Sequence, residues 1–399
     1  MKHYCKNTDA TDYEIIKTAM HKCLNGKLKR TDVREFLLNG DNRPGKKLEY
    51  NEKARTDFEY LDELISKQAR VLRTEIIRED LILKPVKYDI RKDGNSGKKR
   101  NIATESIKQQ CYDYIALECL TPFFAYIGEY QIAGIKGRGT SYGIKAISKW
   151  LKDPKCKYAG KCDIKKCYES INKDMLMLFL NEHVRNDKLL WLIRTLIDTY
   201  KQGLSIGSVL SQCLCTLYLA QLYHEISERM FRVRQCRNGM TKRIRLVSHV
   251  LFQMDDILVI GRNKRDVETT MIGIRVYLLK MGLKLKERPQ VFKIRCGGKK
   301  AVNGERFIDI IGYRFYGHKV KLSLRRRTYK KLRRCYLRAK RKGIDIQRAR
   351  RFISLYGRLK HTNYYKVKSL YNKIFKICKG VVSSYDKSKI CRRAVACYN

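Results

Sequence analysis

The sequence predicts an α+β protein that is built from more than one packed unit. Apolar residues recur at helical spacing through residues 1–80, and a strand-like alternation begins near residue 81. The last fifth of the chain returns to helical spacing with a strongly basic composition. Because a chain of 399 residues exceeds the usual size of one domain, we expect two or three units with their own cores.

The first 80 residues are expected to form helices. Thr11 and Asp12 precede an apolar stripe that ends near Gly26, and a second helix begins at Asp32. Residues 50–78 carry apolar side chains along one face, so they are expected to form one long amphipathic helix.

Residues 83–90 and 100–103 alternate like two strands of a hairpin, and the returning strand opens with Lys98, Lys99 and Arg100. Two interpretations stay open. The cations either form a solvated basic loop or grip phosphate, for which a guanidinium offers forked hydrogen bonds.

Residues 106–125 are expected to be helical, and a glycine-rich stretch follows at 130–140. Its three glycines, with Lys136 and Arg138, would let the backbone lie against a phosphate or a base. The stretch matches neither the Walker pattern nor a dinucleotide fingerprint.

The charge of the chain points to a polyanionic partner. The sequence holds 88 Lys and Arg against 39 Asp and Glu, a net charge of +49. Nucleic acid is the first choice and an anionic membrane surface the alternative, although no apolar run is long enough to span a bilayer. The N-terminus lacks the apolar core of a secretory signal. Fifteen cysteines without a Cys-x-x-Cys pair argue against a zinc site and for a reducing, cytoplasmic location.

An acidic pair, Asp255 and Asp256, stands between two apolar runs within residues 252–260. Two like charges in such a setting are costly unless a cation meets them, and a divalent metal is the obvious candidate. The alternative is ordinary turn chemistry at the tip of a hairpin. Asp163 closes another short strand and could be either a helix cap or a third metal ligand. Three carboxylates suffice for two-metal phosphoryl transfer with Mg²⁺.

Residues 319–399 hold 27 Lys and Arg against two acidic residues. Apolar residues still recur there at helical spacing, for example Leu332 and Tyr336, then Phe352 and Tyr356. A disordered basic tail would lack that stripe, so a small helical domain with one packing face and one phosphate face is expected.

Seven blocks, in this order, resemble those of reverse transcriptases. They are residues 97–102, 133–139, 163–171, 206–212, 254–256, the expected strand 282–286, and 311–313. The resemblance implies a right-hand polymerase with interleaved fingers and palm, an antiparallel palm sheet with helices, and a C-terminal helical thumb. It divides the chain into an N-terminal helical extension (1–80), fingers and palm (81–325), and a basic thumb (326–399).

The resemblance also implies roles for individual residues. The catalytic triad is Asp163, Asp255 and Asp256, and these with Ile164 bind the metal, which is Mg²⁺ with Mn²⁺ as an alternative. Tyr168 corresponds to the steric gate that excludes a ribose 2′-hydroxyl. The implied nucleotide-binding residues are Lys98, Arg100, Tyr168, Ile206, Gly207 and Gln212. The implied template and primer contacts are Lys136, Arg138, Ser211, Gln253, Met254, Gly312, Tyr313, Lys360 and His361.

Residues 206–212, Ile-Gly-Ser-Val-Leu-Ser-Gln, narrow the resemblance. Most reverse transcriptases carry Gln-Gly there and end in Ser-Pro, whereas those of diversity-generating retroelements carry an aliphatic-Gly-x-x-x-Ser-Gln version. Residues 354–365 are also similar to that group. The resemblance implies error-prone copying opposite template adenines. Its implied partners are a template RNA, a cDNA primer, deoxynucleoside triphosphates and a small basic accessory protein, with no membrane. Gln253 departs from the tyrosine usual in the family, which bears on primer positioning or fidelity. The alternatives are a group II intron-like or phage-defence reverse transcriptase, and a catalytically silent RNA-binding scaffold.

Overall fold

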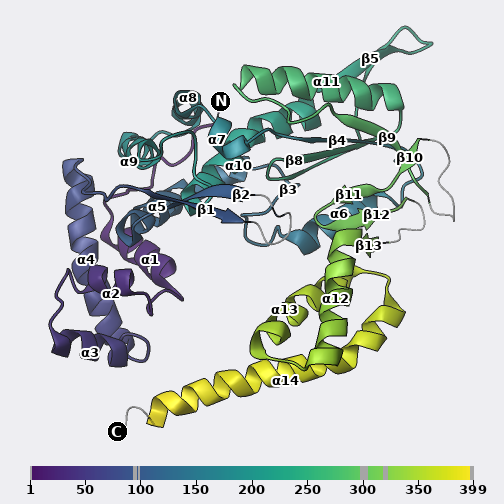
Figure 1. Ribbon diagram of the computed structural model, residues 1–399. Helices are drawn as coiled ribbons and strands as arrows, with labels where there is room; N and C mark the ends of the chain where they lie inside the picture. Colours follow the sequence, from purple (N-terminus) through teal and green to yellow (C-terminus); the bar gives the residue numbers. More distant parts are fainter. Residues whose placement is uncertain (1, 93–96, 98, 297–303, 318–321, 396–399) are drawn as a thin grey trace. The chain divides into compact units, whose positions relative to one another are not determined.

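The computed structural model describes residues 2–92, 97, 99–296, 304–317 and 322–395 (Figure 1). The chain forms two compact units. Unit 1 comprises Met1–Gly134, Cys162–Met230 and Ile272–Arg288, and unit 2 comprises Ile135–Lys161, Phe231–Met271 and Pro289–Asn399. Helices and strands occur in both units, in agreement with the expected mixed class.

Helices dominate unit 1. Its elements in chain order are α1 (Tyr13–Leu24), α2 (Thr31–Leu37), α3 (Pro44–Lys53), α4 (Phe58–Arg78), β1 (Lys87–Lys92), β2 (Lys99–Thr104), α5 (Ile107–Leu120), η1 (Thr121–Tyr126), β3 (Gln131–Ile132), α7 (Cys167–Ser170), α8 (Lys173–His183), α9 (Asp187–Asp198), α10 (Val209–His224) and η2 (Glu225–Arg229). The core of the unit forms around α5, which packs on α1, α9 and α10. Tyr112 of α5 and Tyr218 of α10 are almost fully buried.

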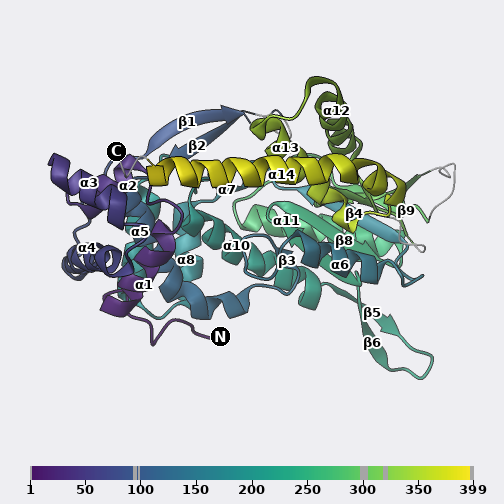
Figure 2. The same ribbon diagram turned by 90° about the horizontal axis from the view of Figure 1, so that it is seen from below.

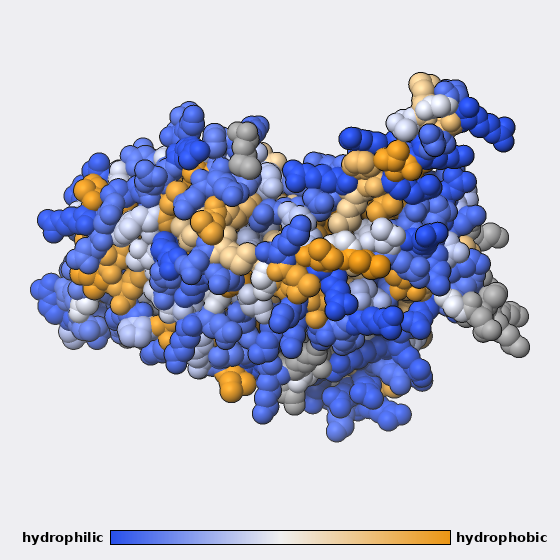
Figure 3. All heavy atoms as spheres, turned by 90° about the horizontal axis from the view of Figure 1, so that it is seen from above, coloured by the Kyte–Doolittle hydropathy of each residue, from blue (hydrophilic) through white to orange (hydrophobic). Residues whose placement is uncertain are grey.

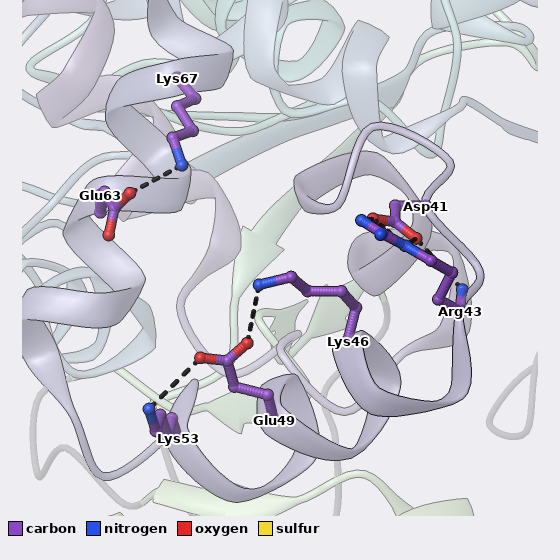
Figure 4. A network of polar contacts seen from close by, with 7 residues as sticks. All are labelled: Asp41, Arg43, Lys46, Glu49, Lys53, Glu63 and Lys67. Carbon is purple, nitrogen blue, oxygen red and sulfur yellow. Dashed lines mark hydrogen bonds and ion pairs between the residues drawn. The ribbon is translucent and has the colours of Figure 1, made fainter.

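The expectation of one helix over residues 50–78 is wrong, because the chain breaks between α3 and α4. Asp57 caps α4 by accepting a hydrogen bond from the backbone N–H of Tyr60 at 3.0 Å. The outer face of this region carries local ion pairs, including Glu49 with Lys46 at 3.0 Å and with Lys53 at 3.3 Å (Figure 4). Exposed pairs of this kind add little stability, so the buried faces of α1, α4 and α5 hold the region together.

A mixed sheet organises unit 2. Its elements are α6 (Thr140–Trp150), β4 (Tyr158–Asp163), β5 (Phe231–Gln235), β6 (Thr241–Arg245), β7 (His249–Gln253), β8 (Asp256–Gly261), α11 (Lys264–Lys280), β9 (Gln290–Ile294), β10 (Glu305–Arg306), β11 (Ile308–Ile310), β12 (Tyr313–Phe315), β13 (Leu322–Leu324), α12 (Arg326–Lys342), α13 (Ile346–Gly357), η3 (Arg358–His361) and α14 (Tyr365–Val395). The last residues of β4 and the second half of α11 belong to unit 1.

Five strands of the sheet run in the order β10-β9-β4-β8-β7, and Figure 2 labels β9, β4 and β8 among them. Residues 257–261 of β8 are all buried, as a central strand requires. Gly160 of β4 is confined, because a Cβ there would lie 2.8 Å from Val259 and from Met271. Two smaller antiparallel sheets, β11-β12-β13 and the ribbon β5-β6, complete the strands of unit 2.

The basic C-terminal segment is helical as predicted. α13 packs on α12 and α14, and the rings of Tyr336 and Tyr371 stack with centroids 4.1 Å apart. Leu332 and Phe352 of the predicted apolar stripe are buried. Within the described ranges, no helix is both long and apolar enough to cross a membrane.

Candidate active site

The acidic pair lies at the tip of the hairpin formed by β7 and β8. Gln253 pairs with Asp256, so only Met254 and Asp255 form the turn. Met254 has φ +55° whereas Asp255 does not, the pattern of a type II′ turn, in which glycine usually takes the first position. A side chain in that region costs about 1–3 kcal/mol. The turn therefore presents two half-buried carboxylates on a strained backbone.

Lys161 meets the second carboxylate of the pair. Its Nζ lies 3.1 Å from Oδ1 of Asp256 and donates a 2.8 Å hydrogen bond to the backbone oxygen of Asp309. The side chain of Asp309 is held in turn by Arg325. The ammonium group of Lys161 thus contacts both Asp256 and Asp309 within unit 2, and it compensates the charge of Asp256.

Asp163 is the last residue of β4 and is half-exposed. Its carboxylate lies 3.2 Å from Nζ of Lys286, and its backbone oxygen accepts from the N–H of Lys286 at 2.9 Å. The hydrogen bond and charge of Asp163 raise the pKa of Lys286. The strand expected over residues 282–286 is reduced to one isolated bridge between Ile164 and Leu285, which still joins two of the predicted blocks.

The predicted nucleotide block folds as a tight loop before α10. Gly203, at φ +52°, lies so close to the backbone that a Cβ would meet the Tyr168 oxygen at 2.4 Å, and the N–H of Leu204 donates to that oxygen at 2.8 Å. A Cβ on Gly207 would lie 2.4 Å from the backbone oxygen of Ala103 in β2. Since β2 also carries Arg100, unit 1 brings together the regions of Arg100, Tyr168 and Gly207.

Hydrogen bonds of three serines, Ser205, Ser208 and Ser211, stabilise this loop. Ser208 caps α10, and the hydroxyl of Ser211 accepts from the N–H of Ser205 at 3.2 Å. Ser211 is fully buried, so in this structure its hydroxyl serves the loop. Its predicted contact with template or primer stays a prediction. Ile206 lies half-buried between these serines.

Beneath the loop lies a buried pair of carboxyl groups that the sequence did not reveal. Ser208 donates to Oδ2 of Asp113 at 2.6 Å, and Tyr200 donates to Glu105. Burial is the main cause that raises the pKa of both Asp113 and Glu105, and their proximity raises that of Asp113 further. Both carboxyl groups therefore bind a proton more readily than exposed carboxyl groups do. A capping serine at 208 could be read from the sequence, but carboxyls on α5 and before it carry no local signal of burial.

The glycine-rich block contacts the end of the same loop. A Cβ on Gly134, which has φ +75°, would lie 3.0 Å from Nε2 of Gln212. Gln212 belongs to unit 1, as do the other described residues predicted to bind the nucleotide. Lys136 is exposed and Arg138 half-buried, and both belong to unit 2. Lys98 lies outside the described residues.

Within unit 2, the fold brings together two predicted primer contacts that lie far apart in sequence. Tyr313 is buried, donates to the backbone oxygen of Arg358 at 2.9 Å, and meets the ring of His361 edge-on at 6.3 Å. His361 is also hydrogen-bonded to Ser141, 3.1 Å away. Gly312 occupies the β11-β12 turn at φ +86°, and Lys360 is exposed beside His361.

Among the described residues, six cations and no acidic residue line a surface hollow at the start of α12, and Arg314 of this set also forms an ion pair with Asp309 at 3.8 Å. The six cations are Arg314, Arg326, Arg327, Lys330, Lys331 and Arg334. Such a lining suits a phosphate backbone.

The candidate metal ligands are divided between the units, with Asp163 in unit 1 and Asp255 and Asp256 in unit 2. Among the described residues, no group of three or more His, Cys, Asp or Glu side chains lies close enough together to hold a metal ion. The donor set nevertheless has the right chemistry for Mg²⁺, because it consists of carboxylate oxygens. The lysines beside Asp163 and Asp256 supply positive charge where a metal would supply it.

Carboxylates at strand ends, a glycine loop against a basic strand, and a basic helical segment are features expected of a nucleotidyltransferase. The family model described as reverse transcriptase (RNA-dependent DNA polymerase) matches residues 90–293. That range is half of the chain, and the chain belongs to the reverse transcriptase family. None of the curated proteins compared with the chain matches it. Members of the family copy an RNA template from a primer with deoxynucleoside triphosphates and generally use divalent ions such as Mg²⁺.

Proposed function

We propose that this reverse transcriptase copies its template RNA into cDNA by two-metal phosphoryl transfer, with Asp163, Asp255 and Asp256 as the metal ligands. The observation that carries the proposal is the ion pair between Lys161 and Asp256. Side chains two residues apart in a strand share a face, so Asp163 is on the same face of β4 as Lys161. That face is the one from which Lys161 reaches Asp256.

The chemistry follows from the charges. A metal bound to these carboxylates would activate the primer hydroxyl and stabilise the leaving oxygens. Lys161 and Lys286 lie in ion-pair contact with Asp256 and Asp163, so positive charge is present at the carboxylates that a metal would bind. The strained turn at Met254 fixes the direction in which Asp255 and Asp256 point.

The loop at 203–211 would hold the incoming nucleotide. Two contacts support this role. Gly207 packs closely against β2, the strand that carries Arg100, and the N–H of Leu204 donates to the backbone oxygen of Tyr168. A triphosphate beside Arg100 would then have its sugar near Tyr168, as a steric gate requires. Lys98 and Gln212 complete the proposed nucleotide set.

The remaining predicted residues would hold the template and primer. Gly312, Tyr313, Lys360 and His361 are supported by their proximity within unit 2, and the cationic hollow at the start of α12 suits the duplex backbone. Lys136, Arg138, Gln253 and Met254 are proposed on the resemblance alone.

We further propose that the enzyme is of the diversity-generating retroelement type, on the Ile-Gly-x-x-x-Ser-Gln form of residues 206–212. This type copies template adenines with errors and acts with a small basic accessory protein. The test is primer extension by the purified full chain on an RNA template with Mg²⁺, followed by sequencing of the cDNA. Substitutions concentrated opposite adenines support the subtype. Errors spread evenly over the four bases overturn it, and no synthesis at all overturns the polymerase proposal.

A further inference from the structure

The ribbon formed by β5 and β6 belongs to none of the blocks discussed so far. Its two strands pair antiparallel from Phe231↔Arg245 to Gln235↔Thr241. Figures 1 and 2 both show the ribbon projecting outward as a hairpin. It is a two-stranded element without a third strand, which is marginally stable by itself.

The ribbon is densely cationic, and its charged side chains are accessible. Between Phe231 and Arg245 it holds six cations and no acidic residue, and all six side chains are exposed: Arg232, Arg234, Arg237, Lys242, Arg243 and Arg245. In the part of the chain that the structure describes, only Arg232 of these makes an ion pair, with Asp266 at 3.3 Å. Figure 3 shows this projection with hydrophilic residues beside paler and more hydrophobic ones.

The arrangement of like charges on the ribbon destabilises the pairing of its two strands. Arg234 lies directly across from Lys242, and like charges in that position are destabilising. Both faces are basic, because Arg243 and Arg245 alternate with Arg234 and Lys242 across the pleat. A charge pattern that weakens its own element and lacks internal counterions is suited to an external polyanion.

The side chains favour RNA with unpaired bases over other polyanions. Five of the six cations are arginines, whose planar groups both fork to phosphate and stack on bases. Arg243 already stacks on Phe231, with 4.5 Å between the guanidinium and the ring centroid. Val233 and Met240 are exposed by 60% and 65%, which adds apolar contact for bases. A reverse transcriptase meets unpaired RNA as the uncopied part of its template.

We infer that the β5-β6 ribbon is a second RNA-binding element, which grips single-stranded or looped RNA apart from the polymerising site. It contacts phosphates with Arg234, Arg237 and Lys242 and stacks bases on its arginine planes. This inference extends the proposed function but does not depend on catalysis. It can therefore be tested in the absence of divalent metal.

The test compares the full chain with the variant R234Q/R237Q/K242Q. The matched control is K152Q/K155Q/K157Q, which removes the same charge from exposed positions of unit 2. Binding of a labelled unstructured RNA is measured by fluorescence anisotropy in EDTA over a series of salt concentrations. Thermal unfolding and extension of a short primer–template are measured on the same samples.

Three phosphate contacts to a single strand contribute about 2 to the slope of log affinity against log salt. The unchanged protein should therefore lose about 20-fold more affinity than the ribbon variant between about 50 and 200 mM salt. The control variant should keep the slope of the unchanged protein, apart from a small general effect of net charge. A third variant, R234K/R237K/R243K, should keep the salt slope yet bind more weakly, because lysine neither forks nor stacks.

Equal losses in the ribbon and control variants would overturn the inference, since net charge alone would then explain them. An effect confined to duplex DNA, or to vesicles containing phosphatidylserine, would overturn the assignment to RNA. If the ribbon variant binds RNA like the unchanged protein while remaining folded, the inference fails. Unaltered extension of the short primer–template is expected throughout, so this failure is distinct from failure of the polymerase proposal.

Discussion

Gly207 gives the sharpest test of the proposed nucleotide loop. A Cβ at this position would lie 2.4 Å from the backbone oxygen of Ala103, whereas ordinary contact begins at 3.4 Å. Because that neighbour is backbone, Gly207→Ala must separate the loop from β2 by about 1 Å. Overpacking of this kind costs about 1–3 kcal/mol of folding stability.

The displacement should affect catalysis as well as folding. A misplacement of about 1 Å in a positioning element can reduce rate about 10²-fold, which corresponds to about 2.7 kcal/mol of transition-state stabilisation. We expect kcat/KM for a single deoxynucleotide to fall by that factor in steady-state primer extension. Primer–template affinity, measured without nucleotide, should change little.

Gly45→Ala is the matched control for Gly207→Ala. Gly45 lies in α3 of the same unit, and a Cβ there would meet nothing within 4 Å. The free energy of unfolding of the control should be unchanged or higher by about 0.5–1 kcal/mol. Its kcat/KM should be unchanged. If Gly207→Ala retains the kcat/KM of the unchanged enzyme, the loop does not position the nucleotide and that assignment is refuted.

Three further outcomes are expected. Asp255→Asn should reduce extension about 10³-fold or more, since metal charge stabilisation is worth several kcal/mol; an unfolding temperature equal to that of the unchanged protein rules out a folding defect, and near-normal extension would contradict the triad. Lys161→Met should lower the Mg²⁺ concentration needed for half-maximal extension and tighten metal binding measured by calorimetry, because a competing cation is removed from Asp256; unchanged metal affinity would contradict this. Asp113→Asn tests how the carboxyl group of Asp113 affects the pH dependence of folding stability. Its raised pKa means that the native state binds the proton more tightly than the unfolded state does. The stabilisation from that proton is therefore greatest below about pH 4 and is lost as pH rises towards the pKa of the folded state. The unfolding temperature of Asp113→Asn relative to the unchanged protein should therefore rise from pH 5 to pH 8, and a constant difference would show that Asp113 does not titrate in this range.

Much of the organisation could be predicted because it has a local signal. The apolar stripe of the C-terminal helices, the hairpin around Asp255 and the strand ending at Asp163 all follow from periodicity and charge. The break between α3 and α4 escaped prediction because residues 54–57 hold no proline or glycine, and the capping residue type at Asp57 was the one local signal of a new helix. What ends α3 there is tertiary packing, with Ala54 buried and Asp57 free to cap the next helix.

The parts of the candidate site that escaped prediction depend on contacts distant in sequence. The Asp113–Ser208 hydrogen bond spans 95 residues and the Lys161–Asp309 bond spans 148. No spacing rule connects such residues, and both partners in each bond belong to common types. Burial decides their importance, and burial is a property of the assembled unit.

Several of the predicted blocks share a strained backbone conformation that the sequence does not indicate. Among the described residues, seven non-glycine residues have positive φ. Four of these fall inside blocks that resemble the family: Ala133, Lys166, Met254 and Ile311. Each costs about 1–3 kcal/mol and persists only where the surroundings enforce it, and Ile311 is the most demanding because a β-branched side chain strongly disfavours that region. Glycine or asparagine would adopt the same backbone conformation at these turns with less strain.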